Sequence, residues 1–429
     1  MSGDTMQLHE ISAENFRAKE AVRLKLGSRL TLLIGENGTG KTTVLDAIAI
    51  ALSVVFKYLP DRKNIKGISF REGDILKKNG QELPYAFIKA ICTNNGPKWD
   101  LMRKRDSNQS TEEQVPRERE GFRGLQQYIE EKIVEPWNKT EDFDLPIIAY
   151  YGVNRALISV PKRRSNFGKN YSRFAALADS LNAISRFRSA LIWMYHKEDE
   201  ERRKQKEERN FDAKLPELEA IHQCIYKLLP GTNNFRTAIN PLRYLIEYGS
   251  QDLKIDQFSD GYKIMLGLAI DLSTRMAAAN PHMDNPLETE GIVLIDEIDL
   301  HLHPTWQQRV ISDLLRTFPN TQFVLTSHSP ILVEGVNNLL KRHAIAHLLP
   351  TSSPESLDAE VKNLYPLDPK DAKVYDMTRD PPENLLDPDE GLTGDTLIDS
   401  FNELSSIFEQ MCDFEDEMST SLSLKEGEV

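Results

Sequence analysis

Residues 35 to 42 read Gly35-Glu-Asn-Gly-Thr-Gly-Lys41-Thr42 and follow a short apolar run, Leu30 to Ile34. The eight residues fit the pattern G-x-x-x-x-G-K-[ST], and apolar side chains recur at helical spacing from Thr42 to about Lys57. A strand, a glycine-rich turn and a helix are therefore predicted in that order. This order is typical of a P-loop and predicts an α/β fold that binds a nucleoside triphosphate.

The residue types in this loop suit phosphate binding. Glycines permit a turn whose backbone N–H groups point at phosphate oxygens, and the start of the following helix adds positive partial charge. The amine of Lys41 is expected to reach the β- and γ-phosphates, and the hydroxyl of Thr42 to bind Mg²⁺. The expected nucleotide-binding residues in this stretch are Asn37, Gly38, Gly40, Lys41, Thr42 and Thr43.

Two later apolar strands end in residues suited to phosphate chemistry. Ile292 to Ile295 is followed by Asp296 and Glu297. This arrangement predicts Asp296 as a metal ligand and Glu297 as the base near an attacking water. Gln322 to Thr326 leads to His328, and ligands bind at the carboxyl ends of strands in open parallel sheets. His328 is therefore expected to sense the γ-phosphate, and Glu297 and His328 are the candidate catalytic residues.

A fourth motif, Phe258-Ser259-Asp260-Gly261-Tyr262-Lys263, precedes an apolar helix predicted from Ile264 to Met276. Together with the three motifs above and the opening Ile11-x-x-x-Asn15-Phe16-Arg17, it resembles the ABC-type ATPases of the RecF, SMC and OLD kind. Within that group, YYGVNR from Tyr150 to Arg155 and LIDEIDLHLHPTWQ from residue 294 look most like the ATPase subunit of Septu and retron-associated anti-phage systems.

This resemblance implies a P-loop NTPase with an ABC-ATPase-like mixed-sheet core, with ATP and Mg²⁺ as cofactors. It implies a head-to-tail dimer in which Ser259 and Gly261 contact the ATP held by the other copy. Asp299 to His303 would form the D-loop-like crossing between subunits. Asp260 replaces the glycine common in transporter signatures, which leaves the details of closure open. The two histidines of the crossing could instead form a metal site, although no further ligand lies at suitable spacing.

Other features of the family are matched less well. A glutamine is expected after the P-loop, and Gln81 is one possible match. Arg155 could reach phosphate or the partner subunit, or form a structural salt bridge. No nuclease chemistry is expected in this chain, because Asp387 and Asp389 lie in a proline-rich acidic segment and only 79 residues follow Pro350.

Composition along the chain predicts its organisation. The two halves of the ATPase core are expected at 1–95 and 241–350, on either side of a largely helical insertion at 96–240. The insertion is expected to return one strand to the core near 146–152. We also expect the stretch from Leu242 to Tyr248 to be a core strand.

The last 79 residues differ from the rest, with 21 acidic against 5 basic side chains. Residues 351–429 are therefore predicted to be an acidic tail. Its one apolar periodicity, from Leu397 to Met411, predicts an amphipathic helix that packs either on the ATPase core or on a partner.

Charge and hydropathy limit the environment. The longest nearly apolar stretch, Ala47 to Phe56, is far shorter than the roughly 20 residues needed to cross a bilayer. The start of the chain has no apolar signal region, and the cysteines Cys92, Cys224 and Cys412 are too far apart for a CxxC site. We expect a cytoplasmic protein with reduced thiols and no membrane partner.

Two functions follow as hypotheses. The first is an ATPase regulatory subunit that forms an ATP-sandwich dimer or higher oligomer and controls a separate effector, such as a nuclease, in anti-phage defence. The second is a RecF-like ATPase of DNA repair or recombination that acts directly on DNA. The first 350 residues are nearly neutral, which gives no support to a nucleic-acid partner but leaves DNA or RNA possible.

Overall fold

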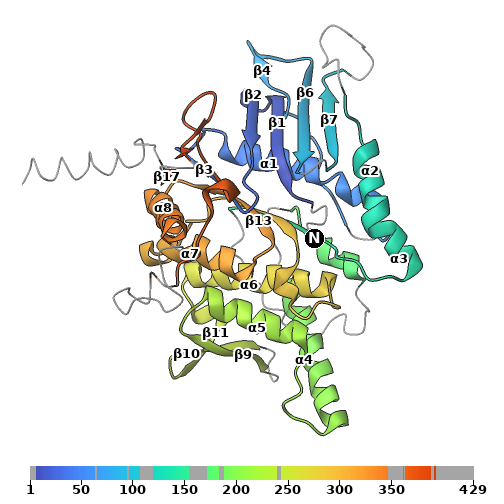
Figure 1. Cartoon of the computed structure of the whole chain (residues 1–429), viewed down its shortest axis with the longest axis vertical. Coiled ribbons are helices and arrows are strands. Elements are labelled where there is room, and N and C mark those ends of the chain that lie inside the picture. Colours follow the sequence, from blue (N-terminus) through green and yellow to red (C-terminus); the bar gives the residue numbers. More distant parts are fainter. Residues whose placement is uncertain are drawn as a thin grey trace, which may run out of the picture.

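The computed structural model describes residues 6–62, 65–93, 96–106, 119–153, 172–182, 188–238, 243–345, 361, 363–387 and 391–392. Its central sheet has six strands in the order β15-β14-β3-β13-β12-β8 (Figure 1). The strands span Leu30–Ile34 (β3), Ile147–Tyr151 (β8), Gly291–Ile295 (β12), Thr321–Ser327 (β13), Ala372–Asp376 (β14) and Glu383–Asn384 (β15). All neighbouring pairs are parallel except β14 with β15.

The inner strands are buried along their whole length and mostly apolar, because other elements cover both faces of the sheet. Every residue of β3, β12, β13 and β8 is buried. The helices of this core span Lys41–Leu52 (α1), Asp260–Ala279 (α6), Pro304–Thr317 (α7) and Pro330–Ala344 (α8). The arrangement is the α/β P-loop fold that the sequence predicts.

A second, antiparallel sheet stands above the first in Figure 1, in the order β2-β1-β6-β7. Its strands span Leu8–Phe16 (β1), Lys19–Lys25 (β2), Tyr85–Cys92 (β6) and Lys98–Lys104 (β7). Helix α1 contacts β1 and β6, so the P-loop helix packs between the two sheets. A small hairpin of Lys77–Lys78 (β4) and Gln81–Glu82 (β5) extends from this sheet.

The region between the two halves of the core is built mainly of helices. They span Arg123–Ile129 (α2), Glu135–Lys139 (α3), Arg188–Glu208 (α4) and Pro216–Leu228 (α5), with a π-helical turn at Glu130–Val134. Short 3-10 turns lie at Val55–Tyr58, Arg173–Leu177, Ile255–Gln257, Pro286–Glu288 and Pro369–Asp371. Helix α4 projects downward, away from both large sheets (Figure 1). Helix α5 packs on α6, which joins this region to the core.

The expectation that Leu242 to Tyr248 would be a core strand is wrong. Strand β10, Arg243–Tyr248, lies in a separate antiparallel sheet between Thr232–Ala238 (β9) and Gln251–Lys254 (β11). Its burial alternates along the strand, because only one face packs on the body. The sequence pattern alone could not distinguish this position from an edge of the main sheet.

The structure also differs from the prediction that residues after 350 form only a tail. Strand β14 pairs in parallel with β3, with Ala372 opposite Leu30 and Asp376 opposite Ile34. Five residues that include Lys373 and Asp376 give too short and too polar a pattern to stand out as a core strand. A last pair, Leu386–Asp387 (β16) with Gly391–Leu392 (β17), follows it.

The domain limits themselves stay a prediction, and the helix expected from Leu397 to Met411 lies outside the described residues. Within the described part of the chain, the helices are too short or too polar to cross a membrane.

Candidate functional site

The glycine-rich turn joins β3 to α1 in a backbone path that favours glycine. Gly35, Gly38 and Gly40 have φ angles of +143°, +86° and +95°, where side chains with a Cβ are rarely accommodated. Gly40 is the N-cap of α1 in the left-handed conformation. The hydroxyl of Thr39 closes the turn by donating to the carbonyl of Glu36 at 3.0 Å. Asn37 and Gly38 are exposed at its tip, where a ligand can reach them.

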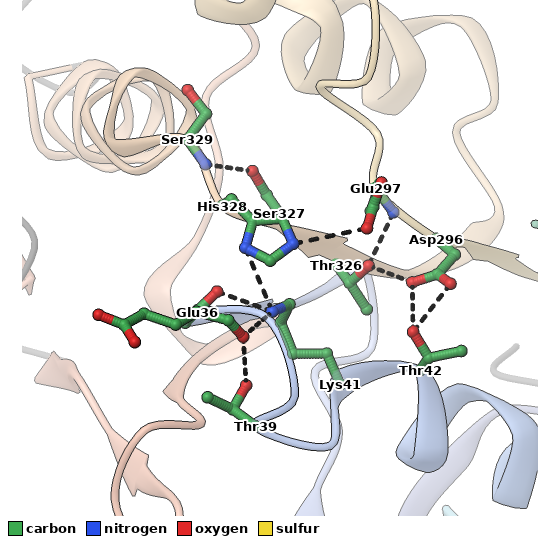
Figure 2. A network of polar contacts seen from close by, with 11 residues as sticks. Glu36, Thr39, Lys41, Thr42, Asp296, Glu297, Thr326, Ser327, His328 and Ser329 are labelled. Carbon is green, nitrogen blue, oxygen red and sulfur yellow. Dashed lines mark hydrogen bonds and ion pairs between the residues drawn. The ribbon is translucent and has the colours of Figure 1, made fainter. Parts of the chain in front are cut away.

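Lys41 is buried and its amine folds back onto the loop. The amine donates to the carbonyls of Gly35 and Glu36 at 2.7 Å each and lies 3.4 Å from Nδ1 of His328 (Figure 2). Burial lowers the pKa of Lys41, while the nearby carboxylate of Asp296 opposes this shift. The amine therefore lies inside the turn that the glycines form.

Thr42, the first exposed residue of α1, meets the end of β12. Its hydroxyl donates to both carboxylate oxygens of Asp296, at 2.9 and 3.2 Å. Asp296 is 2% exposed and also accepts from the hydroxyl of Thr326 at 2.6 Å. Thr43, the next residue of α1, is half-buried. Carboxylate and hydroxyl oxygens are the hard ligands that Mg²⁺ prefers, so Thr42 and Asp296 fit a divalent cation.

Glu297 and His328 face each other across neighbouring strand ends. The carboxylate of Glu297 lies 3.5 Å from Nε2 of His328 (Figure 2). Glu297 has a φ of +47°, and its backbone N–H donates to the Thr326 hydroxyl at 2.8 Å. Both side chains keep more than a quarter of their surface exposed. They can therefore reach a ligand bound in front of the sheet.

A cavity of about 290 Å³ opens beside Thr42 and Asp296. Its wall includes Arg17, Asp46 and Tyr150, none of which the motifs had assigned to the site. Arg17 pairs with Asp46 of α1 and, at 2.8 Å, with Asp74. The sequence signals for these residues were the match of Arg17 to the first strand of the resembled family and the place of Tyr150 in the YYGVNR motif.

Thr326 is a further residue that sequence analysis left without a role. It bonds Asp296 through its hydroxyl and receives the N–H of Glu297, so it holds both acids in place. Its position two residues before His328, on the strand paired with β12, is the signal that could have identified it.

Ser259 and Gly261 do not take part in this network. Ser259 is exposed at the N-cap of α6, and Gly261 packs against the backbone of the stretch from Asp299 to His303. A Cβ at Gly261 would lie 2.5 Å from the carbonyl oxygen of His301. The structure thus brings the signature and the D-loop-like stretch together.

The alternative metal site in the D-loop-like stretch gains no support. The ring of His303 lies 2.9 Å from the Thr305 hydroxyl and caps α7. Among the residues that the structure describes, no cluster of three or more histidine, cysteine or acidic side chains could hold a metal ion. Gln81 is exposed in the β4–β5 hairpin and lies outside the network described above, and Arg155 falls outside the described residues.

The fold and this network define a P-loop ATPase. Residues 30–334 match the family described as "AAA domain, putative AbiEii toxin, Type IV TA system". The chain therefore belongs to this family, and it is an ATPase.

Relatives with descriptive names span most of the chain. "Retron Ec83 probable ATPase" of Escherichia coli is 28% identical over 79% of this chain and 71% of its own length. "Retron Vc95 probable ATPase" of Vibrio cholerae is 28% identical over 81% and 76%. Septu protein PtuA of Bacillus thuringiensis is 23% identical over 83% and 78%. Among solved structures, an SMC head bound to the C-winged helix domain of ScpA has a TM-score of 0.42 at 16% identity, and covers 77% of this chain and 92% of that one.

Proposed function

We propose that this chain binds ATP with Mg²⁺ at the P-loop, dimerises on ATP and controls a separate effector protein in anti-phage defence. The observation that carries the proposal is a polar network that joins three segments of the chain. It links Lys41 and Thr42 to Asp296 and Glu297, which follow β12, and to His328, which follows β13. These segments are far apart in the sequence, so only the fold assembles the site.

Each residue of the network has a role in this proposal. The amine of Lys41 would leave the loop carbonyls that it now contacts and bind oxygens of the β- and γ-phosphates. The backbone N–H groups of Asn37 to Thr43 would surround the same phosphates. Thr42 and Asp296 would hold Mg²⁺, which neutralises charge on the phosphates when bound. Glu297 would take a proton from the attacking water. His328, beside both Lys41 and Glu297, would contact the γ-phosphate.

The proposed dimer accounts for the exposed signature. Ser259 and Gly261 take no part in the polar network described above for this chain's P-loop, and Ser259 is exposed at the start of a long helix. A helix N-terminus favours anionic ligands. In a head-to-tail pair, these residues would bind the γ-phosphate held by the second copy.

The names of the relatives support the defence role, because they are those of the retron and Septu systems that the sequence resembles. Two are named as retron ATPases and others as Septu PtuA, and they match over most of the chain. A second candidate, a RecF-like ATPase acting directly on DNA, is favoured by a match of 46% identity to Rickettsia RecF proteins, but that match spans 43 residues, or 10% of the chain. We therefore prefer the first.

The experiment is co-purification of the Glu297→Gln chain with the product of the adjacent gene, with and without ATP, followed by mass measurement. A complex that contains two copies of this chain and an effector, and that requires ATP, is expected. A monomer that binds double-stranded DNA in the presence of ATP and retains no neighbouring product would favour the RecF-like alternative instead.

A further inference from the structure

Two consecutive tyrosines end strand β8 and belong to the YYGVNR motif, which the proposed function leaves without a role. Strand β8 lies at one end of the main sheet, with Tyr150 opposite Leu294 and Tyr151 opposite Ile295 of β12. The backbone N–H of Asp296 donates to the carbonyl of Tyr151 at 2.8 Å. The tyrosines are thus level with the end of the strand that presents Asp296.

Tyr150 faces the helix that follows the P-loop. Its side chain is 3% exposed, and it lines the cavity beside Thr42 together with Asp46, whose carboxylate acts on the tyrosine hydroxyl. Asp46 lies one helical turn after Thr42 on α1 and pairs with Arg17 at the end of β1. Burial and the Asp46 carboxylate raise the pKa of Tyr150, so the hydroxyl faces that carboxylate in its protonated form. Tyr150 therefore ties β8 to α1.

Tyr151 is bonded to the helix that follows the signature motif. Its fully buried hydroxyl donates to Asp271 of α6 at 2.9 Å. Arg275, one turn further on, donates to the same carboxylate oxygen at 2.7 Å and to the carbonyl of Ala176 at 2.6 Å. Successive side chains of a strand point to opposite faces of the sheet. The two tyrosines therefore hold one helix on each face.

The attachment to α6 resists rearrangement. A buried carboxylate that loses a hydrogen-bond donor keeps an uncompensated charge, which is costly in a low-dielectric interior. Asp271, whose side chain is 3% exposed, is thus held to Tyr151 and Arg275. On the other face, Asp46 is part-buried and paired with Arg17, and the peptide between the tyrosines is a single stiff unit. A displacement of α1 when phosphates enter the loop would move Tyr150, and with it Tyr151 and Asp271.

We propose that Tyr150 and Tyr151 are positioning residues that couple the P-loop helix α1 to the signature helix α6. Through them, the nucleotide bound by this chain influences the surface that carries Ser259 and Gly261. This inference rests on the proposed function for the role of that surface, but the coupling between the two helices can be measured separately.

The test uses hydrogen exchange of the full chain with and without ATP, in the Glu297→Gln background so that ATP persists. Tyr150→Phe and Tyr151→Phe each remove one hydroxyl and keep the ring. Tyr375→Phe is the matched control, because Tyr375 is a buried tyrosine of the same sheet whose hydroxyl donates to the carbonyl of Lys25 at 3.0 Å. Sedimentation of the same samples reports dimer formation.

ATP should slow exchange in α1 and in the first turns of α6 in the parent and in Tyr375→Phe. In Tyr150→Phe and in Tyr151→Phe, protection of α1 should persist while the ATP-dependent protection of α6 falls roughly tenfold, about 1.4 kcal/mol. In the double variant, the ATP-dependent protection of α6 should fall no further than in the more affected single variant. The reason is that breaking either contact already interrupts the one connection between α1 and α6.

The inference is overturned if α6 of the parent does not respond to ATP, or if both variants retain its full response. The inference is also overturned if Tyr375→Phe loses the ATP response of α6 as fully as the other variants do. Loss of any buried tyrosine hydroxyl would then have the same effect. If α6 responds as expected while sedimentation shows only monomer, the proposed dimer fails and the coupling stands.

Discussion

Thr42 and Asp296, which are 254 positions apart in the chain, share a hydrogen bond of 2.9 Å. This bond joins the first turn of α1 to the end of β12. Because the two groups offer oxygen atoms side by side, the geometry suits a shared cation as well as it suits the direct bond. The same pair therefore provides a direct test of the metal role.

Asp296→Asn keeps the size of the side chain and removes its charge. We expect ATP affinity of the parent to fall when EDTA removes Mg²⁺, and affinity of the variant to be low and insensitive to EDTA. Calorimetric titration with and without Mg²⁺ measures both. Asp252→Asn, at an exposed acid of β11, is the control and should behave like the parent. A variant that still gains affinity from Mg²⁺ would remove Asp296 from the metal site.

Lys41→Ala should weaken ATP binding at least tenfold, because charge-assisted hydrogen bonds contribute roughly 1.5–3 kcal/mol each. The amine lies within the turn and is 5% exposed, so no neighbouring side chain can simply take its place. Lys77→Ala, at an exposed lysine of the β4–β5 hairpin, should bind normally. Binding measured by fluorescence of a labelled nucleotide decides the matter, and unchanged affinity in Lys41→Ala would contradict the assignment.

Glu297→Gln should leave ATP binding within a few-fold of the parent and lower hydrolysis by roughly 10²–10⁴, the usual contribution of a general base. Glutamine fits the same backbone, so the positive φ of this position adds no new strain. Phosphate release under single-turnover conditions is the measurement. Glu82→Gln, on the surface hairpin, is the control. Retained turnover in Glu297→Gln would show that another group accepts the proton.

The network could be predicted from the sequence only at residues that belong to local motifs. Lys41, Asp296 and His328 each follow or precede a recognisable strand, and their types suit phosphate chemistry. Thr326 and Tyr150 lie in or beside recognised motifs but were given no role, and Asp46 lies within the predicted helix after the P-loop with no motif to mark it. Their roles depend on which strands and helices lie side by side, and that is set by tertiary packing.

The sequence predicts the fold class, but it does not predict the place of every strand. Strands β3, β12 and β13 were found because a strand buried on both faces is a continuous apolar run. Strand β14 was missed because it is short, begins after an acidic segment and includes Lys373, although it pairs with β3 along its length. Strand β10 was assigned to the wrong sheet, since an amphipathic strand fits many sheets equally well.

Gly261→Ala should destabilise the chain as well as disturb the proposed dimer. The added Cβ would lie 2.5 Å from the carbonyl oxygen of His301, which is a backbone atom and cannot turn aside as the end of a flexible side chain can. Overpacking of this kind costs roughly 1–3 kcal/mol. Thermal unfolding should show a lower midpoint than the parent.

Gly124→Ala is the matched comparison, since Gly124 is also helical and its Cβ would meet only the carbonyl of Lys98, at 3.9 Å. It should be neutral or stabilising by up to about 1 kcal/mol, the helix-propensity difference between the two residues. If both alanine variants unfold at the same temperature as the parent, the close approach at Gly261 has no energetic consequence.

The last prediction concerns the acidic part of the chain and uses two truncations. A chain that ends at Leu392 keeps β14 and the β16–β17 pair, whereas one that ends at Asp368 loses all of them. Strand β14 covers β3, which leads into the P-loop, and the N–H of Met377 donates to the carbonyl of Ile34 at 2.8 Å. Val374 and Met377 are almost fully buried, so their removal exposes apolar core.

We therefore expect the chain ending at Leu392 to be soluble and to hydrolyse ATP at the parent rate, and the chain ending at Asp368 to be insoluble or unable to bind ATP. The first truncation also decides between the two positions proposed for the predicted helix from Leu397 to Met411. If this truncation keeps ATPase activity but no longer co-purifies with the effector, the helix packs on a partner. Its acidic flanks would then steer association with a basic partner. Loss of solubility or ATPase activity in the chain ending at Leu392 would show instead that the helix packs on the ATPase core, and the docking hypothesis would be abandoned.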